Sequence, residues 1–256
     1  MLEGEIGKGC ESMKTVDILG VQVASCTLVQ AREAVFNMLQ EDKLHMVFTP
    51  NSEIVMLARK NKPFQDILNR ADLCTADGIG VVYGAKLLGT PIPERVAGFD
   101  LLTDVLQHGD GISIYLFGSK PGVADKAKKE ILHRFTGIEI VGVQNGYFDE
   151  KQEQAIIADI REKRPDILLV CLGAPKQEEW IWRHQEELGA KVAMGLGGSL
   201  DVLAGEVKRA PEFFIKLGLE WLYRLLKEPK RIIRMMALPH FLLVVLKEKW
   251  SGGKRQ

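Results

Sequence analysis

Small or polar segments follow each of six predicted β-strands in this 256-residue chain, and they are the first candidates for chemistry. These segments are Thr49-Pro50-Asn51, Asp77-Gly78, Gly118-Ser119, Asn145-Gly146, Gly173-Ala174-Pro175-Lys176-Gln177 and Gly197-Gly198-Ser199. In an open α/β sheet, ligands bind in the crevice at the carboxyl ends of the strands. The segments therefore predict one shared ligand site, although each one alone also fits ordinary turn and cap chemistry.

Asp77 is the candidate general base in this group. It ends a predicted strand and precedes Gly78, which would place its carboxylate at the rim of the crevice. The alternative is that Asp77 caps the predicted helix 79–88. A cap and a base are compatible only if one carboxylate oxygen stays free.

The segment from Gly78 to Gly84 contains a G-x-G-x-x-x-G pattern directly after a predicted strand. This pattern is similar to a dinucleotide fingerprint, which also requires an acidic residue about 20 residues further on. Asp100 has that distance, but it lies at the expected start of a helix. An NAD(P)-binding oxidoreductase therefore stays open as an alternative function from another class of enzyme.

The sequence offers no recognisable metal-ligand motif, because its five histidines form no paired pattern and no Asp-x-Asp occurs. We expect no metal and no cofactor. A metal-free enzyme that uses nucleotide sugars needs other cations beside the leaving diphosphate, and arginine suits this role. Arg224, Arg231 and Arg234 would lie roughly on one side of a continuous helix, unless Pro229 bends it. They are the candidate diphosphate-binding residues.

The charge of the chain is divided unequally. Residues 208–256 carry 12 Lys and Arg against 4 Asp and Glu, whereas residues 1–207 carry 22 against 30. The basic part also contains Phe213, Trp221, Tyr223 and Trp250. This combination fits an anionic membrane surface or a pyrophosphate. A solvated helical face packed on the body and a non-enzymatic membrane adaptor are the alternatives.

Strand and helix patterns alternate through most of the chain, which predicts an α/β fold with a Rossmann-like, largely parallel sheet covered by helices. The expected strands are 16–20, 21–24, 45–49, 73–76, 113–117, 139–143, 167–172 and 192–196. The expected helices are 27–40, 52–60, 79–88, 99–107, 122–135, 150–163 and 176–187. From Ala210-Pro211 the pattern is wholly helical, with breaks at Pro229 and Pro239.

Three parts follow from this pattern: a catalytic α/β domain at 13–207, a basic helical appendage at 208–250 and a loose N-terminal extension at 1–12. The N-terminus lacks the apolar stretch of a signal peptide, and no apolar run is long enough to span a bilayer. The four cysteines are far apart, which is typical of reduced thiols in a cytoplasmic protein.

Several ordered motifs resemble the bacterial WecG/TagA/CpsF-type glycosyltransferases, which include wall teichoic acid N-acetylmannosaminyltransferases. Relatives in this family make enterobacterial common antigen and exopolysaccharides. The resemblance covers about residues 15–246. It is carried by Thr49–Ile54, Ala76–Gly80, Pro93–Asp100, Leu172–Glu178, Gly195–Asp201, Val207–Pro211, Gly218–Arg224, Glu228-Pro229 and Arg234–Pro239. Many relatives have proline where this chain has Ala76.

The resemblance implies inverting, metal-independent transfer of N-acetylmannosamine from UDP-N-acetylmannosamine. The acceptor would be the 4-hydroxyl of N-acetylglucosamine on undecaprenyl diphosphate. The uronic acid of N-acetylmannosamine and glucose are alternative donor sugars. The resemblance further implies a place on the inner face of the cell membrane and association of copies through the body. We expect no nucleic-acid partner, since the basic patch is confined to the appendage and no nucleic-acid motif accompanies it.

The same resemblance implies roles for individual residues. Asp77 is the base, Arg95 lies near the reacting centre, and Arg224 and Arg231 close over the diphosphate. Thr49 and Asn51 line the acceptor side, and Gln177 lies close to the sugars. The other candidate substrate-binding residues, from the crevice segments, are Gly118, Ser119, Gly197, Gly198, Ser199 and Asp201.

Overall fold

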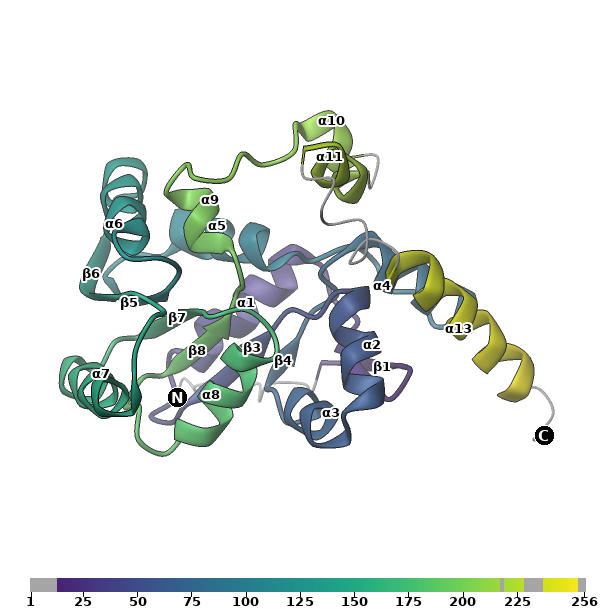
Figure 1. Cartoon of the computed structure of the whole chain (residues 1–256), viewed down its shortest axis with the longest axis horizontal. Helices are drawn as coiled ribbons and strands as arrows, with labels where there is room; N and C mark the ends of the chain where they lie inside the picture. The colour runs from purple at the N-terminus through teal and green to yellow at the C-terminus, as the bar shows by residue number, and fades with distance from the viewer. Residues whose placement is uncertain (1–12, 217–218, 228–236, 253–256) are drawn as a thin grey trace, which may run out of the picture.

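The computed structural model describes residues 13–216, 219–227 and 237–252 (Figure 1). Within these residues, the centre of the fold is a parallel sheet of six strands. They are β3 (His45–Phe48), β4 (Leu73–Cys74), β5 (Ile112–Gly118), β6 (Ile138–Gln144), β7 (Ile167–Cys171) and β8 (Val192–Gly195). In space the strands run in the order β4-β3-β8-β7-β5-β6. The predicted α/β class with a parallel sheet is confirmed.

Helices cover both faces of the sheet, so its central strands are buried on both sides. All residues of β3, β7 and β8 are buried, as continuous apolar runs in parallel sheets usually are. One face packs against α2 (Ser52–Lys60), α3 (Lys62–Asn69), α4 (Ile79–Leu88), α7 (Glu150–Lys163) and α8 (Lys176–His184). The other packs against α1 (Leu28–Met38), α5 (Gly98–His108), α6 (Val123–Arg134) and α9 (Ser199–Leu203).

Local sequence signals account for the start of several helices. Thr27 caps α1 through a reciprocal capping box with Gln30. The sequence analysis missed the short helices α3 and α9. A signal for α3 was present, because Asn61 caps it by accepting a hydrogen bond from Phe64 N–H at 3.2 Å and Pro63 lies in its first turn.

An antiparallel hairpin of β1 (Thr15–Ile18) and β2 (Val21–Ala24) lies beside α3 and β4. Asn69, the last residue of α3, holds the hairpin from both sides. Its Oδ1 accepts from Gln22 N–H and its Nδ2 donates to Gly20 O, each at 2.8 Å. The hairpin thus covers the β4 edge of the sheet and supports the strand that leads to Asp77.

The appendage is helical where the structure describes it: α10 (Glu212–Lys216), α11 (Glu220–Lys227) and α13 (Ala237–Gly252). Helix α13 lies along α2 and α4 (Figure 1). Helix α13 begins at Ala237, so Pro239 lies in its first turn, where a proline costs no hydrogen bond. The residues just before α13 lie outside the described ones, so the expected break near Pro239 stays a prediction. Pro229 lies outside the described residues. Among the described helices, none combines the length and apolar character needed to span a membrane.

Two glycines of α4 receive side chains of α13, which gives the G-x-G-x-x-x-G pattern a structural role. A Cβ atom at Gly80 would collide with Leu238, and one at Gly84 would lie 2.8 Å from the ring of Phe241. Phe241 and Val245 are fully buried in this contact. The glycines allow two helices to approach closely, so the dinucleotide-fingerprint interpretation of the pattern is not supported.

Replacing Phe241 with alanine tests this helix contact. We expect the packing of α13 on the body to become about 3–5 kcal/mol less stable, because truncating a buried aromatic side chain leaves a cavity. Leu243→Ala on the same helix is the matched control, since Leu243 is 65% exposed. It should change stability by less than about 0.5 kcal/mol. Hydrogen exchange of the α13 amides measures both, and equal exchange in the two variants would contradict the packing described here.

Candidate active site

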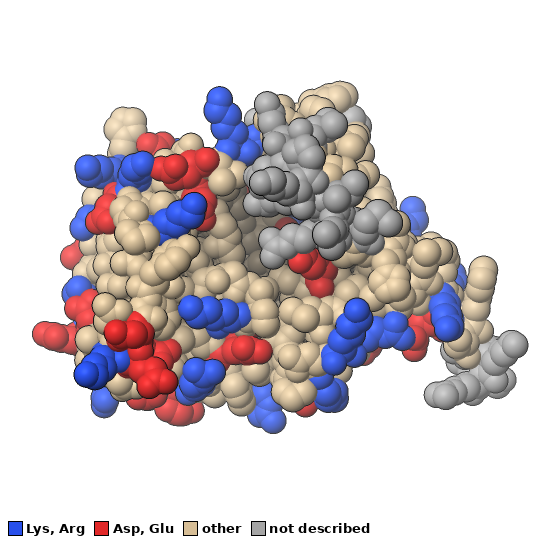
Figure 2. Space-filling view, in the orientation of Figure 1, with Lys and Arg blue, Asp and Glu red and all other residues tan. Residues whose placement is uncertain are grey.

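All the predicted site segments lie beyond the carboxyl ends of the parallel strands. From β3 the chain continues to β4 at one edge of the sheet, and from β5 it continues to β6 at the other edge. The strands β7 and β8 lie between β3 and β5. Loops that leave neighbouring strands in opposite directions open a crevice at that point. Figure 2 shows a hollow in the surface of the body on this face. Acidic and basic side chains are interspersed over the body on this face.

Asp77 lies just beyond β4, and its backbone N–H bonds to Pro50 O at 3.2 Å. The capping alternative is wrong: Gly78 is the N-cap of α4, with φ of 115°, and α4 has no side-chain cap. Instead, Asp77 Oδ2 accepts from Gly98 N–H, the first residue of α5, at 3.4 Å. The side chain is 34% exposed. Its carboxylate is therefore held at a helix start and still reaches solvent.

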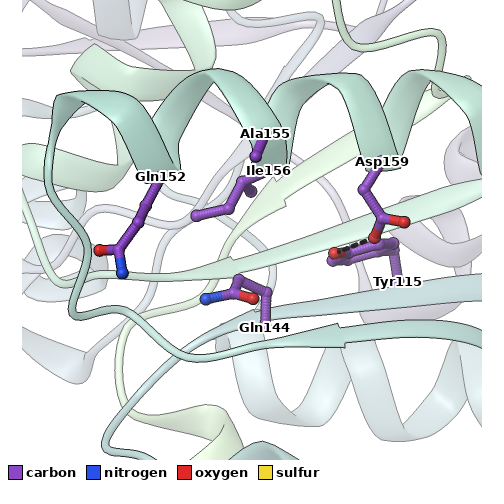
Figure 3. Close-up of a pocket in the computed structure, with 6 residues that line it drawn as sticks. All are labelled: Tyr115, Gln144, Gln152, Ala155, Ile156 and Asp159. Carbon is purple, nitrogen blue, oxygen red and sulfur yellow. Dashed lines mark hydrogen bonds between the residues drawn. The ribbon is translucent and has the colours of Figure 1, made fainter.

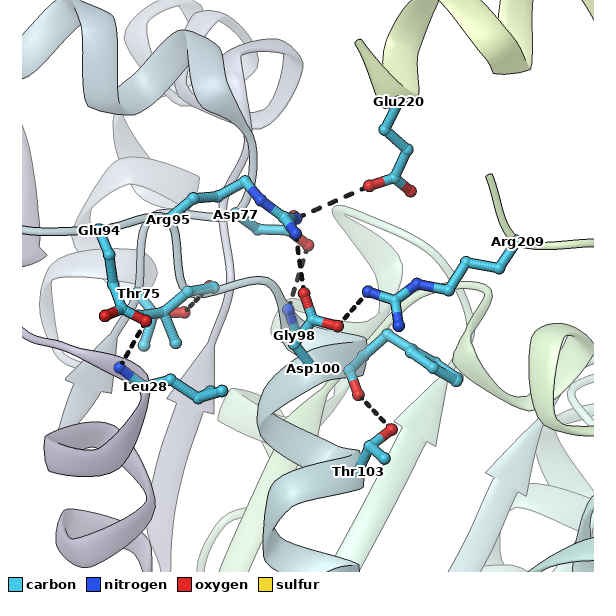
Figure 4. Close-up of polar contacts among 12 residues, drawn as sticks. Leu28, Thr75, Asp77, Glu94, Arg95, Gly98, Asp100, Thr103, Arg209 and Glu220 are labelled. Carbon is cyan, nitrogen blue, oxygen red and sulfur yellow. Dashed lines mark hydrogen bonds and ion pairs between the residues drawn. The ribbon is translucent and has the colours of Figure 1, made fainter. Parts of the chain in front are cut away.

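Arg95 reaches Asp77 from the loop between α4 and α5. Its Nη1 lies 4.0 Å from Asp77 Oδ1, and its Nη2 lies 2.8 Å from Asp100 Oδ2 (Figure 4). The loop is fixed to the β4 extension by Val96, whose N–H donates to Ala76 O at 3.0 Å. The structure thus brings together the two residues predicted to be catalytic, and only 16% of the Arg95 side chain is exposed.

Three charged residues of this cluster were missed as site residues by the sequence analysis. Asp100 is paired with both Arg95 and Arg209, and Glu220 Oε2 lies 3.7 Å from Arg95 Nη1. The Arg209 guanidinium also lies 4.9 Å from the ring of Phe99. Asp100 had a signal, since it lies in the same motif as Arg95 and in the first turn of α5, where an acidic side chain is favoured. Arg209 and Glu220 also lie in segments that carry the resemblance, but their place beside Asp100 and Arg95 depends on how the appendage packs on the body.

Thr49 and Asn51 adjoin the same cluster. A Cβ atom at Gly98 would lie 2.7 Å from Thr49 Oγ1, so the glycine lets α5 approach the end of β3. Asn51 caps α2 by accepting from Ile54 N–H at 3.1 Å. Its own Cβ lies 3.5 Å from the position that a Cβ of Gly78 would take. The predicted acceptor-side residues therefore neighbour the Asp77 loop.

Gln177 joins two loops of the crevice. The side chain is buried, and its Oε1 accepts from Gly173 N–H at 3.1 Å and from Gly197 N–H at 2.9 Å. These two N–H groups follow β7 and β8. The amide Nε2 donates to Glu178 Oε1 at 2.9 Å, which fixes the orientation of the amide. Gln177 thus shapes the glycine loops from beneath.

The remaining predicted residues form a second group on the β5 side. Ser119 Oγ donates to Asp201 Oδ2 at 2.9 Å, which ties the loop after β5 to α9. Gly118 has φ of 136°, and a Cβ there would overlap Cys171 O. Ser199 is buried, and its hydroxyl donates to Leu196 O at 2.8 Å. It closes the turn at Gly197 and Gly198 that precedes α9.

The structure describes little of the predicted diphosphate-binding group. Arg224 belongs to α11, but its side chain is not among those described. Arg231 and Arg234 lie outside the described residues. Their role stays a prediction.

A cavity of about 250 Å³ lies between α7 and the strands β5 and β6 (Figure 3). Its lining includes Tyr115, whose hydroxyl donates to Asp159 Oδ2 at 2.7 Å, together with Gln144 and Gln152. Burial and the neighbouring carboxylate raise the pKa of Tyr115. The cavity lies at the β6 edge, whereas Asp77 follows β4 at the opposite edge. It is separate from the candidate active site.

Buried ionisable groups lie under the crevice as well. Burial raises the pKa of the Cys74 and Cys171 thiols to about 12, so both stay protonated and unreactive near neutral pH. Glu178 is 1% exposed, and its Oε2 has no hydrogen-bond partner among the described residues. Loss of solvation raises the pKa of Glu178 to about 7. Glu178 is therefore a largely neutral acid in the folded protein below pH 7.

Glu178 should make the protein less stable as the pH rises. Below pH 4.5 the side chain is protonated in both the folded and the unfolded chain. Between pH 4.5 and about 7 only the folded chain keeps the proton, so folding loses about 3 kcal/mol across this window. Above about pH 7 the side chain is ionised in both states, and the free energy of unfolding falls no further on account of Glu178. Glu178→Gln should flatten this decline in urea unfolding at pH 5 and pH 8.

Glu186→Gln is the matched control for that measurement, because Glu186 is exposed and does not contribute to the raised pKa of Glu178. It should keep the pH dependence of the unchanged protein. An equal decline in the Glu178→Gln protein would show that Glu178 does not hold its proton in the folded state.

The whole chain is similar to known glycosyltransferases. The model of the Glycosyl transferase WecG/TagA/CpsF family matches residues 16–255. An N-acetylglucosaminyldiphosphoundecaprenol N-acetyl-beta-D-mannosaminyltransferase of Bacillus spizizenii is 39% identical over 219 residues, or 84% of each chain. The protein of the same name from Staphylococcus aureus (strain MRSA252) is 35% identical over 238 residues, covering 91% of this chain and 93% of the relative. The chain therefore belongs to the WecG/TagA/CpsF family of glycosyltransferases.

Proposed function

We propose that this protein transfers N-acetylmannosamine from UDP-N-acetylmannosamine to the 4-hydroxyl of N-acetylglucosamine on undecaprenyl diphosphate. The names of the relatives support this sugar and this acceptor. The observation that carries the chemistry is the Asp77 carboxylate, which caps no helix of its own and lies beside Arg95 at the carboxyl end of the sheet. The reaction inverts the anomeric centre and uses no metal.

Inversion requires a single displacement and one base. Asp77 takes the proton of the acceptor hydroxyl while its oxygen attacks the anomeric carbon of the donor sugar. The bond between that carbon and the diphosphate breaks at the same time, and UDP leaves with the electron pair. Arg224, Arg231 and Arg234 stabilise the negative charge that develops on the leaving diphosphate.

The crevice loops supply the remaining contacts in this proposal. Thr49 and Asn51 lie on the acceptor side, and Gln177 keeps the glycine loops close to the sugars. The backbone of Gly118, Gly197 and Gly198 lets the donor approach closely. Ser119, Ser199 and Asp201 shape the far side of the crevice.

The appendage docks on the anionic inner face of the cell membrane, where the lipid acceptor is anchored. Phe213, Leu243 and Trp250 are large apolar side chains that are at least 65% exposed, and Lys247 and Lys249 are exposed on α13. Exposed aromatic and basic side chains on helices suit an interfacial position. Each cation near such a surface contributes about 1 kcal/mol. Away from the membrane, the same apolar side chains favour association of copies.

Replacing Asp77 with asparagine tests the base. The amide cannot take the proton, so we expect turnover to fall by about 10²- to 10⁴-fold while folding and vesicle binding are kept. The measurement is UDP release from a panel of UDP-sugars, with and without a lipid-diphosphate-GlcNAc analogue. If the protein turns over the UDP-linked uronic acid of N-acetylmannosamine or UDP-glucose faster than UDP-N-acetylmannosamine, the faster substrate is the donor. An Asp77→Asn protein that keeps more than half its activity would refute the assignment of the base.

Reversing one charge of the appendage tests membrane docking. Arg224→Glu should weaken binding to vesicles that contain anionic lipid and should lower acceptor-dependent turnover on them. Lys151→Glu, at an exposed position of α7 on the body, is the matched charge reversal and should leave both unchanged. Co-sedimentation with anionic and neutral vesicles measures the binding. Equal losses in the two variants would indicate a general charge effect rather than a docking surface.

A further inference from the structure

Arg95 lies among three carboxylates that come from three different elements. Asp100 belongs to α5, Asp77 follows β4, and Glu220 begins α11 of the appendage (Figure 4). Arg209, on the segment between α9 and α10, is the other cation of this group and pairs with Asp100. The cluster therefore connects the proposed base directly to the C-terminal appendage.

The two terminal nitrogens of Arg95 have different surroundings. Nη2 is bound to Asp100 at 2.8 Å. Nη1 lies 4.0 Å from Asp77 Oδ1 and 3.7 Å from Glu220 Oε2. Both of these distances exceed a hydrogen bond, so Nη1 is shared between the two carboxylates as an ion pair with each. Its position depends on the balance between them.

This balance affects how well Asp77 can accept a proton. A cation that moves closer to a carboxylate favours its charged form, and the carboxylate then becomes a weaker base. Arg95 and Glu220 are 16% and 20% exposed, so solvent and salt screen this cluster less than a surface pair. If the negative charge of Glu220 were removed, Nη1 would be drawn toward Asp77.

We propose that Glu220 is a positioning residue that holds Arg95 back from a direct hydrogen bond with Asp77. The appendage would then set the reactivity of the base, in addition to any role at the diphosphate or the membrane. This inference rests on the proposed function, in which Asp77 is the general base.

Glu220→Gln tests the proposal, because it removes the charge and keeps the shape. We expect kcat to fall roughly 3- to 10-fold and the acidic limb of its pH profile to move about one unit to lower pH. The KM for the UDP-sugar should stay within about twofold, because the proposal places no donor contact on Glu220. Glu220→Asp keeps the charge and should restore part of the lost rate.

Glu248→Gln is the matched control. Glu248 on α13 also pairs an appendage carboxylate with an arginine of the body, Arg59 on α2, at 3.4 Å. Its loss removes a similar contact without touching Arg95. This variant should keep kcat and the acidic limb of the unchanged protein.

A double-mutant cycle with Arg95→Gln separates positioning from simple docking of the appendage. If Glu220 acts through Arg95, then Glu220→Gln should have no further effect on kcat in the Arg95→Gln background. An unmoved acidic limb in Glu220→Gln, or an equal rate loss in Glu248→Gln, would overturn the inference. If Glu220→Gln does not fold, Glu220→Ala removes the same charge, and an unchanged kcat and acidic limb in that variant would overturn the inference too. Absence of acceptor-dependent UDP release by the unchanged protein would instead refute the proposed function itself.

Discussion

Parallel pairing of six buried strands is the constraint on which the site depends. Because all strands of the sheet run the same way, every loop that follows a strand is delivered to one end of the body. Residues as far apart in the sequence as Thr49, Asp77 and Ser199 therefore lie around a single crevice simply because each follows a strand of this sheet. The cost of this arrangement is that the strands are buried on both faces, which requires the helices of both layers and the β1–β2 hairpin at the edge.

Glycines make this arrangement compact where two segments must approach closely. Gly98 lets the start of α5 lie against Thr49, and its N–H is the donor that holds Asp77. Gly118 leaves room for the carbonyl of Cys171 between neighbouring loops. Gly80 and Gly84 let α13 pack on α4. The helix that carries the G-x-G pattern therefore uses its glycines for packing, and the same contact attaches the appendage to the body beside the Asp77 loop.

The polar interior of the site is organised by shared partners rather than by isolated pairs. One amide, Gln177, accepts hydrogen bonds from two loops, and one guanidinium, Arg95, balances three carboxylates. Glu178 lies beneath the first arrangement as a neutral acid, since its burial disfavours a charge. Shared partners couple the loops mechanically and electrostatically. The Arg95 cluster thereby joins α11 of the appendage to the Asp77 loop through Glu220.

The sequence by itself determined the order of the elements, the parallel sheet and the crevice segments. It also marked Asp77, because strand periodicity and glycine turns are local signals, whereas Arg95 was marked only by the resemblance to a known family. It left the role of the Gly78–Gly84 pattern open, because the same spacing fits a dinucleotide site and close packing of two helices. Only the tertiary structure decided that Gln177 joins two loops, that Asp77 does not cap α4, and that Arg209 and Glu220 belong to the cluster. Asp100 and Arg209 are 109 residues apart, and no local pattern encodes a contact that arises only when the appendage packs on the body.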